Sequence, residues 1–198
     1  QRLDELQEKI KSFSTRILKS ECLDLPEKLY TKRTVAMTPE QLKAYVEMKR
    51  SAMTFLDNDK MMSAPTVLTQ IIRLHQITCG HFKSDDGEVV SLKNNRLQEL
   101  LNILEETSGK VIIWAVYRHD IQTIEKGIGD LYGKECVASY YGDTPDSERQ
   151  FIVDNFQDNE NPLRFFVGNP KTGGYGLTLT SSHTVVYYSN DYSLEVRM

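Results

Sequence analysis

Phosphate binding is the first chemistry that the sequence suggests, because residues 168–180 read GNPKTGGYGLTLT directly after the apolar run LRFFV. A strand that ends in lysine, threonine and glycines is typical of phosphate-binding loops. The lysine of such a loop follows the glycines, however, whereas Lys171 precedes Gly173, Gly174 and Gly176. The glycine spacing does not match a dinucleotide-binding fingerprint either. By itself, the segment predicts a loop whose backbone turns sharply or approaches another group closely.

Two further loops carry side chains that could meet an anion. In YYGDTPDSER, we expect Thr144 to be the N-cap of a helix whose first residue is Pro145. The same hydroxyl, with the free N–H groups of a helix start, could instead hold a phosphate of a nucleic-acid backbone. In YRHD, Arg118 or His119 could meet an anion, or could be solvated at a helix start. The local chemistry leaves both alternatives open.

Metal chemistry finds little support in the sequence. The four histidines include no pair at the i, i+4 spacing of helical metal ligands. Cys22, Cys79 and Cys136 are far apart and form no C-x-x-C pair, so we expect small buried side chains there. His81 lies two residues after Cys79, but a helix that ends at Gly80 explains TCGH more simply. We therefore predict no metal site.

The composition is that of a globular protein, with 198 residues, 39% hydrophobic and 26% charged. The net charge of −4 argues against nonspecific adhesion to nucleic acid by the whole surface. Residues 111–198 hold 7 Lys and Arg against 12 Asp and Glu, so any DNA contact there requires a few placed residues. No apolar run approaches the roughly 18 residues of a membrane helix, and the polar start is unlike a signal peptide. We expect a cytoplasmic or nuclear protein that is neither secreted nor membrane-bound.

Periodicity places these loops on a predictable scaffold. The first 110 residues are mostly helical in pattern, with a capping box at Thr38 and Gln41, where Pro39 is the first helical residue. An extended run is expected at 28–37 and a hairpin at 82–92. The predicted helices of this part are 3–13, 38–56, 64–80 and 94–107.

The remainder alternates strands with helices. Apolar runs predict strands at 110–116, 135–140, 163–168 and 184–190, with helices at 118–132 and 145–156 between them. This order implies an α/β domain with an open, mostly parallel sheet and helices on both faces. Ligands of such sheets bind beyond the carboxyl ends of the strands, which is where all three marked loops lie.

Five segments of the sequence resemble one known family. KVIIWAVYRHDI, YYGDTPDSERQFIVDNF and GNPKTGGYGLTLTSSHTVVYYSNDYS resemble motifs IV, IVa and V of the C-terminal RecA-like lobe of Swi/Snf-type ATPases, members of helicase superfamily two. STRILKSECLDLPEKLYTKRTVAMTPEQLKAY resembles the linker between lobes, and LTQIIRLHQITCGHF the helix that follows it. The resemblance implies an inter-lobe linker helix and strand at 1–37, a helical segment with a hairpin packed on the lobe at 38–109, and a RecA-like helicase core at 110–198.

The resemblance also implies a function. Members of the family bind ATP and Mg²⁺ between two RecA-like lobes and move along double-stranded DNA. Residues are carried over by their positions within the matching motifs. The ATP cleft would include Gly173, Gly174, Gly176 and Leu177; DNA would be bound by Tyr117, Arg118, Gly142, Thr144, Lys171 and Thr178; and Arg149 and Asp191 would support these loops.

Two features differ from the usual family pattern. Thr178 stands where asparagine is usual, and DYSL at 191–194 replaces Asp-Trp-Asn-Pro. The resemblance further implies that motif VI, with its catalytic arginines, and the N-terminal lobe lie outside these residues. We therefore expect no catalytic residue in this fragment, no bound ATP or Mg²⁺, and no activity of its own. The alternatives are a non-enzymatic α/β module that binds protein or nucleic acid, and a lobe of an RNA helicase.

Overall fold

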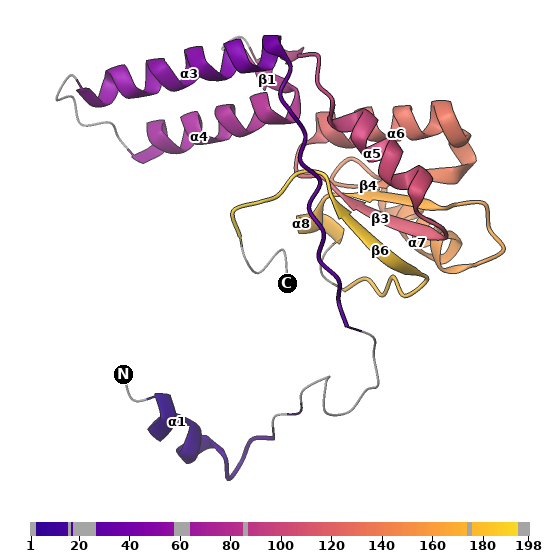
Figure 1. The fold of residues 1–198 in the computed structure, drawn as a ribbon. Helices are drawn as coiled ribbons and strands as arrows, with labels where there is room; N and C mark the ends of the chain where they lie inside the picture. Colours follow the sequence, from indigo (N-terminus) through magenta and orange to yellow (C-terminus); the bar gives the residue numbers. More distant parts are fainter. Residues whose placement is uncertain are drawn as a thin grey trace. The chain divides into compact units, whose positions relative to one another are not determined.

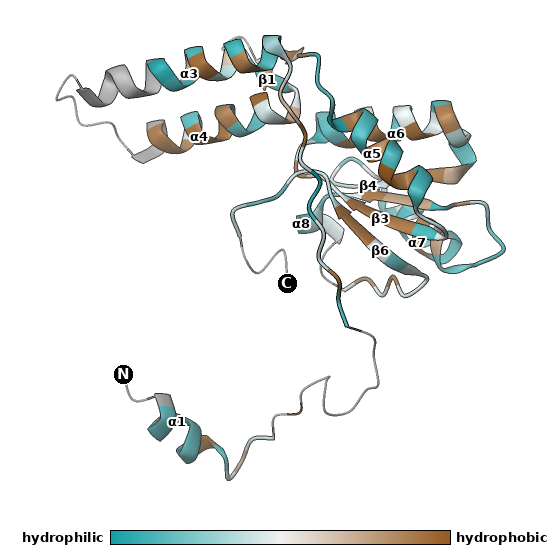
Figure 2. Cartoon of the chain, viewed as in Figure 1, coloured by the Kyte–Doolittle hydropathy of each residue, from teal (hydrophilic) through white to brown (hydrophobic). Residues whose placement is uncertain are grey.

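The computed structural model describes residues 3–15, 17, 27–57, 64–84, 87–173 and 176–193. The chain divides into two compact units, residues 1–33 and 34–198. In the first unit, α1 (Leu3–Ile10) is an exposed and largely hydrophilic helix, with an ion pair of 3.1 Å between Lys9 and Glu5 (Figure 2). None of the described helices is both long and apolar enough to span a bilayer.

The second unit contains a four-stranded parallel sheet (Figure 1). Its strands are β3 (Lys110–Trp114), β4 (Val137–Tyr140), β5 (Phe165–Gly168) and β6 (Ser182–Tyr187), in the order β4-β5-β3-β6. Gly168 pairs with Trp114 on one side and with Tyr140 on the other. Because these strands end in register, the loops that follow them begin at the same edge of the sheet.

Helices cover both faces of the sheet, as predicted. Side chains alternate along β3, so Val111 and Ile113 face one layer whereas Ile112 and Trp114 face the other. The first layer is formed by α5 (Arg96–Glu106) and α6 (Arg118–Tyr132), and the second by α7 (Asp146–Gln157). Hydropathy colouring shows the apolar strands between these helices (Figure 2). The predicted α/β class is confirmed.

The helical segment before the sheet consists of α3 (Pro39–Asp57), α4 (Ala64–Cys79) and a hairpin of β1 (His81–Lys83) and β2 (Val89–Ser91). The predicted capping box is confirmed: Gln41 N donates to Thr38 Oγ1 at 3.3 Å, and Thr38 N donates to Gln41 Oε1 at 3.1 Å. The buried Gln41 side chain also donates to the carbonyl of Ile77 at 3.0 Å, which joins α3 to α4.

Helix α5 packs on the sheet through Leu100 and Leu104, and the predicted domain bounds at 38–109 and 110–198 stay a prediction. Two local predictions differ from the structure. Residues 28–37 form no strand, because they pair with no neighbouring strand among the described residues. The segment after β5 begins with a short helix, α8 (Pro170–Gly173), where a loop was expected. The role of residues 1–37 as a linker between lobes stays a prediction.

Candidate functional site

Asn169 joins the loops that follow three of the four parallel strands. Its backbone N–H donates to Tyr140 O at 3.1 Å, and its side-chain Nδ2 donates to Val116 O at 2.8 Å. Its Oδ1 accepts from Lys171 N at 2.9 Å, which fixes the start of α8. Sequence reasoning missed this residue, although an asparagine directly after a buried strand is the kind of signal that could have identified it.

Ser189 performs the corresponding task after β6. The side chain is 1% exposed, and its Oγ accepts from Val116 N at 2.9 Å while donating to Asp120 Oδ2 at 3.1 Å. Asp120 lies in the first turn of α6 and is itself buried. The loops after β3 and β6 are thus held by a largely buried polar network, and neither Ser189 nor Asp120 was identified from the sequence.

The glycine segment after β5 packs closely against the sheet. An added Cβ at Gly173 would lie 3.2 Å from ring atoms of Trp114, closer than side chains normally approach. Gly176 has φ of 78° and is exposed, so this position favours glycine for its backbone conformation. Leu177 packs against the buried layer that contains Trp114, and Gly174 lies outside the described residues. The close-approach prediction holds for Gly173, whereas its assignment to an ATP cleft stays a prediction.

Arg118 and the loop after β4 come together as expected. The Nη1 atom of the Arg118 guanidinium lies 3.0 Å from Oδ1 of Asp143, and both side chains are solvent-accessible. A Cβ at Gly142 would lie 3.6 Å from Arg118 Nη2, which is ordinary contact. The start of α6 and the loop that carries Gly142 are therefore neighbours on the surface.

Lys171 forms a second cationic position at this edge. Its Nζ lies 2.7 Å from Asp191 Oδ2, while its side chain remains 65% exposed. The hydrogen bond from Lys171 lowers the pKa of the Asp191 carboxyl. Asp191 therefore orients Lys171, and its expected role in supporting a DNA-binding loop stays a prediction. Thr178, in the same loop, is exposed.

Thr144 does not cap the helix that follows it, so that prediction is wrong. Helix α7 begins at Asp146, and Pro145 holds the N-cap position without a side-chain bond. The hydroxyl of Thr144 turns back instead, accepting from Tyr141 N at 3.0 Å and donating to Ser139 O at 3.1 Å. Thr144 is 7% exposed. Because its hydroxyl is committed to this turn, the assignment of the side chain to DNA is withdrawn.

Arg149 lies where a brace for that turn was expected. Its Nε donates to Thr144 O at 3.2 Å and its Nη2 to Tyr141 O at 3.5 Å. The guanidinium also lies 3.3 Å from Asp146 and above the ring of Tyr140, 5.5 Å from its centroid. One side chain therefore connects β4, the turn and the first residue of α7.

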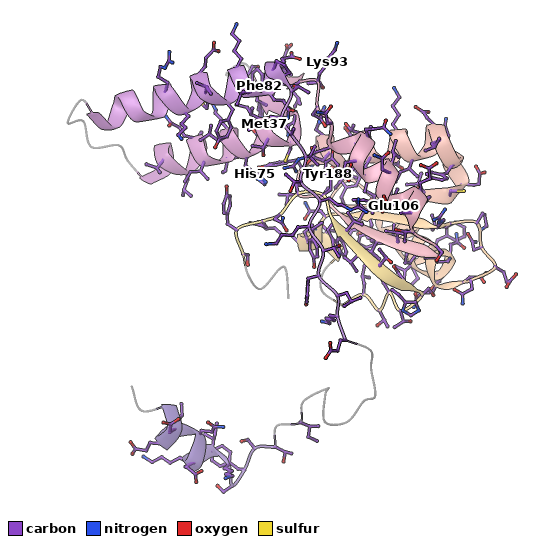
Figure 3. The ribbon with its side chains drawn as sticks, viewed as in Figure 1. Met37, His75, Phe82, Lys93, Glu106 and Tyr188 are labelled. Atoms are coloured by element: carbon purple, nitrogen blue, oxygen red, sulfur yellow. The ribbon has the colours of Figure 1, made fainter. Side chains whose placement is uncertain are left out.

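Tyr117 points into the protein, toward α4, and not toward the exposed edge. Its hydroxyl lies 2.9 Å from His75 Nδ1, and its ring packs edge-on against His81 with centroids 5.0 Å apart. Burial raises the pKa of the Tyr117 phenol and lowers that of the His75 imidazole. Figure 3 shows His75 and Tyr188 where the helical segment meets the sheet. The assignment of Tyr117 to DNA is therefore also withdrawn, and its role is to join the two parts.

An open parallel sheet covered on both faces, with its polar and glycine-rich loops gathered at the carboxyl edge, is the arrangement of a doubly wound α/β domain, the class to which RecA-like lobes belong. The model of the helicase conserved C-terminal domain family matches residues 92–198. The chain belongs to this family, and it is a C-terminal lobe of the Swi2/Snf2 type.

Known proteins resemble the chain over most of its length. YwqA of Bacillus subtilis, whose name describes an ATP-dependent helicase/translocase, is 27% identical over 94% of this chain and 21% of its own length. The human chromatin-remodeling ATPase INO80 is 30% identical over 56% of this chain and 7% of its own. The Sulfolobus solfataricus SWI2/SNF2 ATPase core in complex with dsDNA superposes with a TM-score of 0.69, at 25% identity, over 94% of this chain and 41% of that one. The chain thus spans about a fifth of the length of YwqA.

Proposed function

We propose that the chain is one lobe of a motor that couples ATP hydrolysis to movement along duplex DNA. Two findings support the proposal: the relatives are named as ATP-dependent enzymes, and the similar Sulfolobus core was solved with dsDNA. The observation that carries it is the pair of exposed cations, Arg118 and Lys171, on neighbouring strand ends of a hydrogen-bonded edge. In this proposal the protein acts in the cytoplasm or in the nucleus, where its DNA substrate is found.

The two cations suit a substrate of repeating phosphates. Each is oriented by one carboxylate, Asp143 for Arg118 and Asp191 for Lys171, and each remains accessible to solvent. A phosphate oxygen can take the place of the carboxylate oxygen with little rearrangement of the cation. A motor that steps along DNA benefits from such contacts because phosphates recur independently of base sequence. Gly142 and Thr178 would border this surface.

The nucleotide would lie on the glycine segment. The backbone at Gly176 is exposed, and a Cβ there would meet nothing within 4 Å, so another group can approach it. The N–H groups of Thr172 and Gly173, in contrast, donate to Asn169 O at 3.0 and 2.9 Å. The segment therefore fits one wall of a nucleotide site. We propose that an N-terminal RecA-like lobe of the same protein supplies the main phosphate and Mg²⁺ ligands.

Salt-dependent DNA binding by the full-length protein tests the DNA surface. Arg118→Ala and Lys171→Ala should each weaken binding to any duplex and lower the slope of log K against log salt by about 1. Lys134→Ala is the matched control, because Lys134 lies just before β4, at the amino-terminal ends of the strands, whereas Arg118 and Lys171 follow their carboxyl ends. Equal slopes for all variants would refute the assignment.

The alternative functions gain no support from the comparisons. A non-enzymatic module does not explain a similarity to ATP-dependent relatives. A preference for RNA over DNA in stimulating ATP hydrolysis would revive the RNA-helicase alternative.

A further inference from the structure

Three metal-ligating side chains converge beside the network of Ser189, at a place that the sequence did not reveal. His81 comes from β1, and His119 and Asp120 come from the first turn of α6. One potential ligand atom from each lies within 4.8 Å of the others. His81 Nδ1 is 3.2 Å from an Asp120 carboxylate oxygen, and the two imidazole centroids are 4.6 Å apart. Residues 38 positions apart in sequence thus form one cluster.

The cluster is buried and incompletely bonded. The side chains of His81 and Asp120 are 3% and 1% exposed. Among the described residues, the Nδ1 atom of His119 is buried and has no hydrogen-bond partner, and the buried Nδ1 of His81 has only the Asp120 carboxylate, 3.2 Å away, beside it. A buried polar atom without a partner is unfavourable, and such atoms usually mark a missing ion, water or proton. An unpartnered imidazole nitrogen beside a buried histidine–carboxylate pair points to a cation.

The far sides of two of these ligands, His119 and Asp120, are already anchored. His119 Nε2 lies 2.9 Å from Ser91 Oγ on β2, and Asp120 Oδ2 accepts from Ser189 Oγ at 3.1 Å. Metal-binding imidazoles and carboxylates are normally oriented by a second hydrogen bond of this kind, which leaves the other atom free for the ion. The free atoms are then His119 Nδ1 and Asp120 Oδ1, the second of which lies 3.2 Å from His81 Nδ1.

We propose that His81 Nδ1, His119 Nδ1 and Asp120 Oδ1 bind a divalent transition-metal ion of the zinc class. Two imidazoles and one carboxylate are ligands that zinc accepts at about 2.0–2.2 Å, with a fourth position for water. Ligand atoms around a tetrahedral ion are roughly 3.4 Å apart, so the His81–Asp120 pair is already close to this spacing. His119 must approach by on the order of 1 Å, which its half-buried position allows.

Cys79 is not a member of the ligand set. Its thiol accepts a hydrogen bond from Arg96 Nη1 at 3.5 Å, and that guanidinium also donates to Tyr188 O at 2.7 Å. The positive charge of Arg96 opposes a second cation on the sulfur. The ion would therefore lie on the histidine side of Asp120.

Such an ion would connect the hairpin to α6. His81 belongs to β1 and Ser91 to β2, whereas His119 and Asp120 directly follow Arg118. The bound ion would thus fix the helical segment on the lobe next to one of the proposed DNA contacts. The site is structural, and its occupancy can be measured whether or not the motor function is correct.

Titration of the 198-residue chain with Co²⁺ and Zn²⁺ tests the proposal. We expect one Co²⁺ per chain, with the visible absorption of a four-coordinate ion, and displacement by Zn²⁺. His119→Ala should weaken binding more than 100-fold. Ser91→Ala, which removes only the outer hydrogen bond, should weaken it 10- to 100-fold. His183→Ala, on the exposed face of β6, should bind like the wild type.

Circular dichroism of the metal-free proteins provides the folding control. His119 is used in place of His81 because it is less buried, so the variant should retain the wild-type spectrum. Zn²⁺ should raise the Tm of the wild type and of His183→Ala, but not that of His119→Ala. Absence of stoichiometric binding in the wild type, or equal affinity in folded His119→Ala and His183→Ala, would overturn the proposal.

Discussion

Replacement of Thr144 by valine should destabilise the lobe, because the hydroxyl makes two internal hydrogen bonds. Valine keeps the shape but leaves Tyr141 N–H and Ser139 C=O without the partners that lie at 3.0 and 3.1 Å. Each buried polar group left unpaired costs about 1–3 kcal/mol. Both bonds are only partly buried, so we expect a total loss of about 2–3 kcal/mol in the free energy of unfolding. For a unit of this size, that loss lowers the Tm by roughly 4–12 °C.

Urea and thermal denaturation, followed by circular dichroism, measure the effect. Thr178→Val is the matched control, since Thr178 is exposed in a loop, and it should change stability by less than about 0.5 kcal/mol. Thr144→Ser retains the hydroxyl and should lose less than the valine variant. If Thr144→Val were as stable as Thr178→Val, the hydroxyl would not hold the turn, and a role at the surface would again be open.

Three further substitutions test other parts of the site. Asp191→Asn should cost at most about 1 kcal/mol at neutral pH, because Lys171 is 65% exposed. Because the pKa of Asp191 is lowered in the folded state, the ionised carboxylate stabilises the fold at pH values above its ordinary pKa of 3.8. This contribution is lost as the pH falls through the folded-state pKa, so the stabilities of wild type and variant should converge in urea titrations at acid pH. Gly168→Ala should cost about 1–3 kcal/mol in thermal unfolding, because its Cβ would lie 2.7 Å from a ring carbon of the tryptophan, whereas Gly142→Ala should be nearly neutral. Gln41→Ala removes the capping box and a buried bond to α4, and should lower the free energy of urea unfolding by about 2–3 kcal/mol.

Features that depend on near neighbours could be predicted from the sequence. The capping box joins Thr38 to Gln41 within one helical turn, and the alternation of Val111 and Ile112 follows from the geometry of a single strand. The strands and the helices between them fix parallel connections. They also place the marked loops at one edge, which the structure confirms for Arg118 and Lys171.

Features that depend on strand order could not be predicted in the same way. The order β4-β5-β3-β6 puts Asn169 beside Val116 and Ser189 beside Asp120, pairs that lie far apart in sequence. Thr144 could not be predicted for a different reason. Its hydroxyl could either cap the helix that follows or bond back to Tyr141 and Ser139, and only the path of the turn decides between these alternatives.

DNA-stimulated ATP hydrolysis by the full-length protein tests the central claim most directly. The account predicts that duplex DNA increases the rate in the wild type and in Lys134→Ala with the same half-maximal DNA concentration. The Arg118→Ala, Lys171→Ala double variant should need at least about tenfold more DNA, because two phosphate contacts are lost. A wild-type rate that duplex DNA leaves unchanged, or a double variant that responds like Lys134→Ala, would contradict the account.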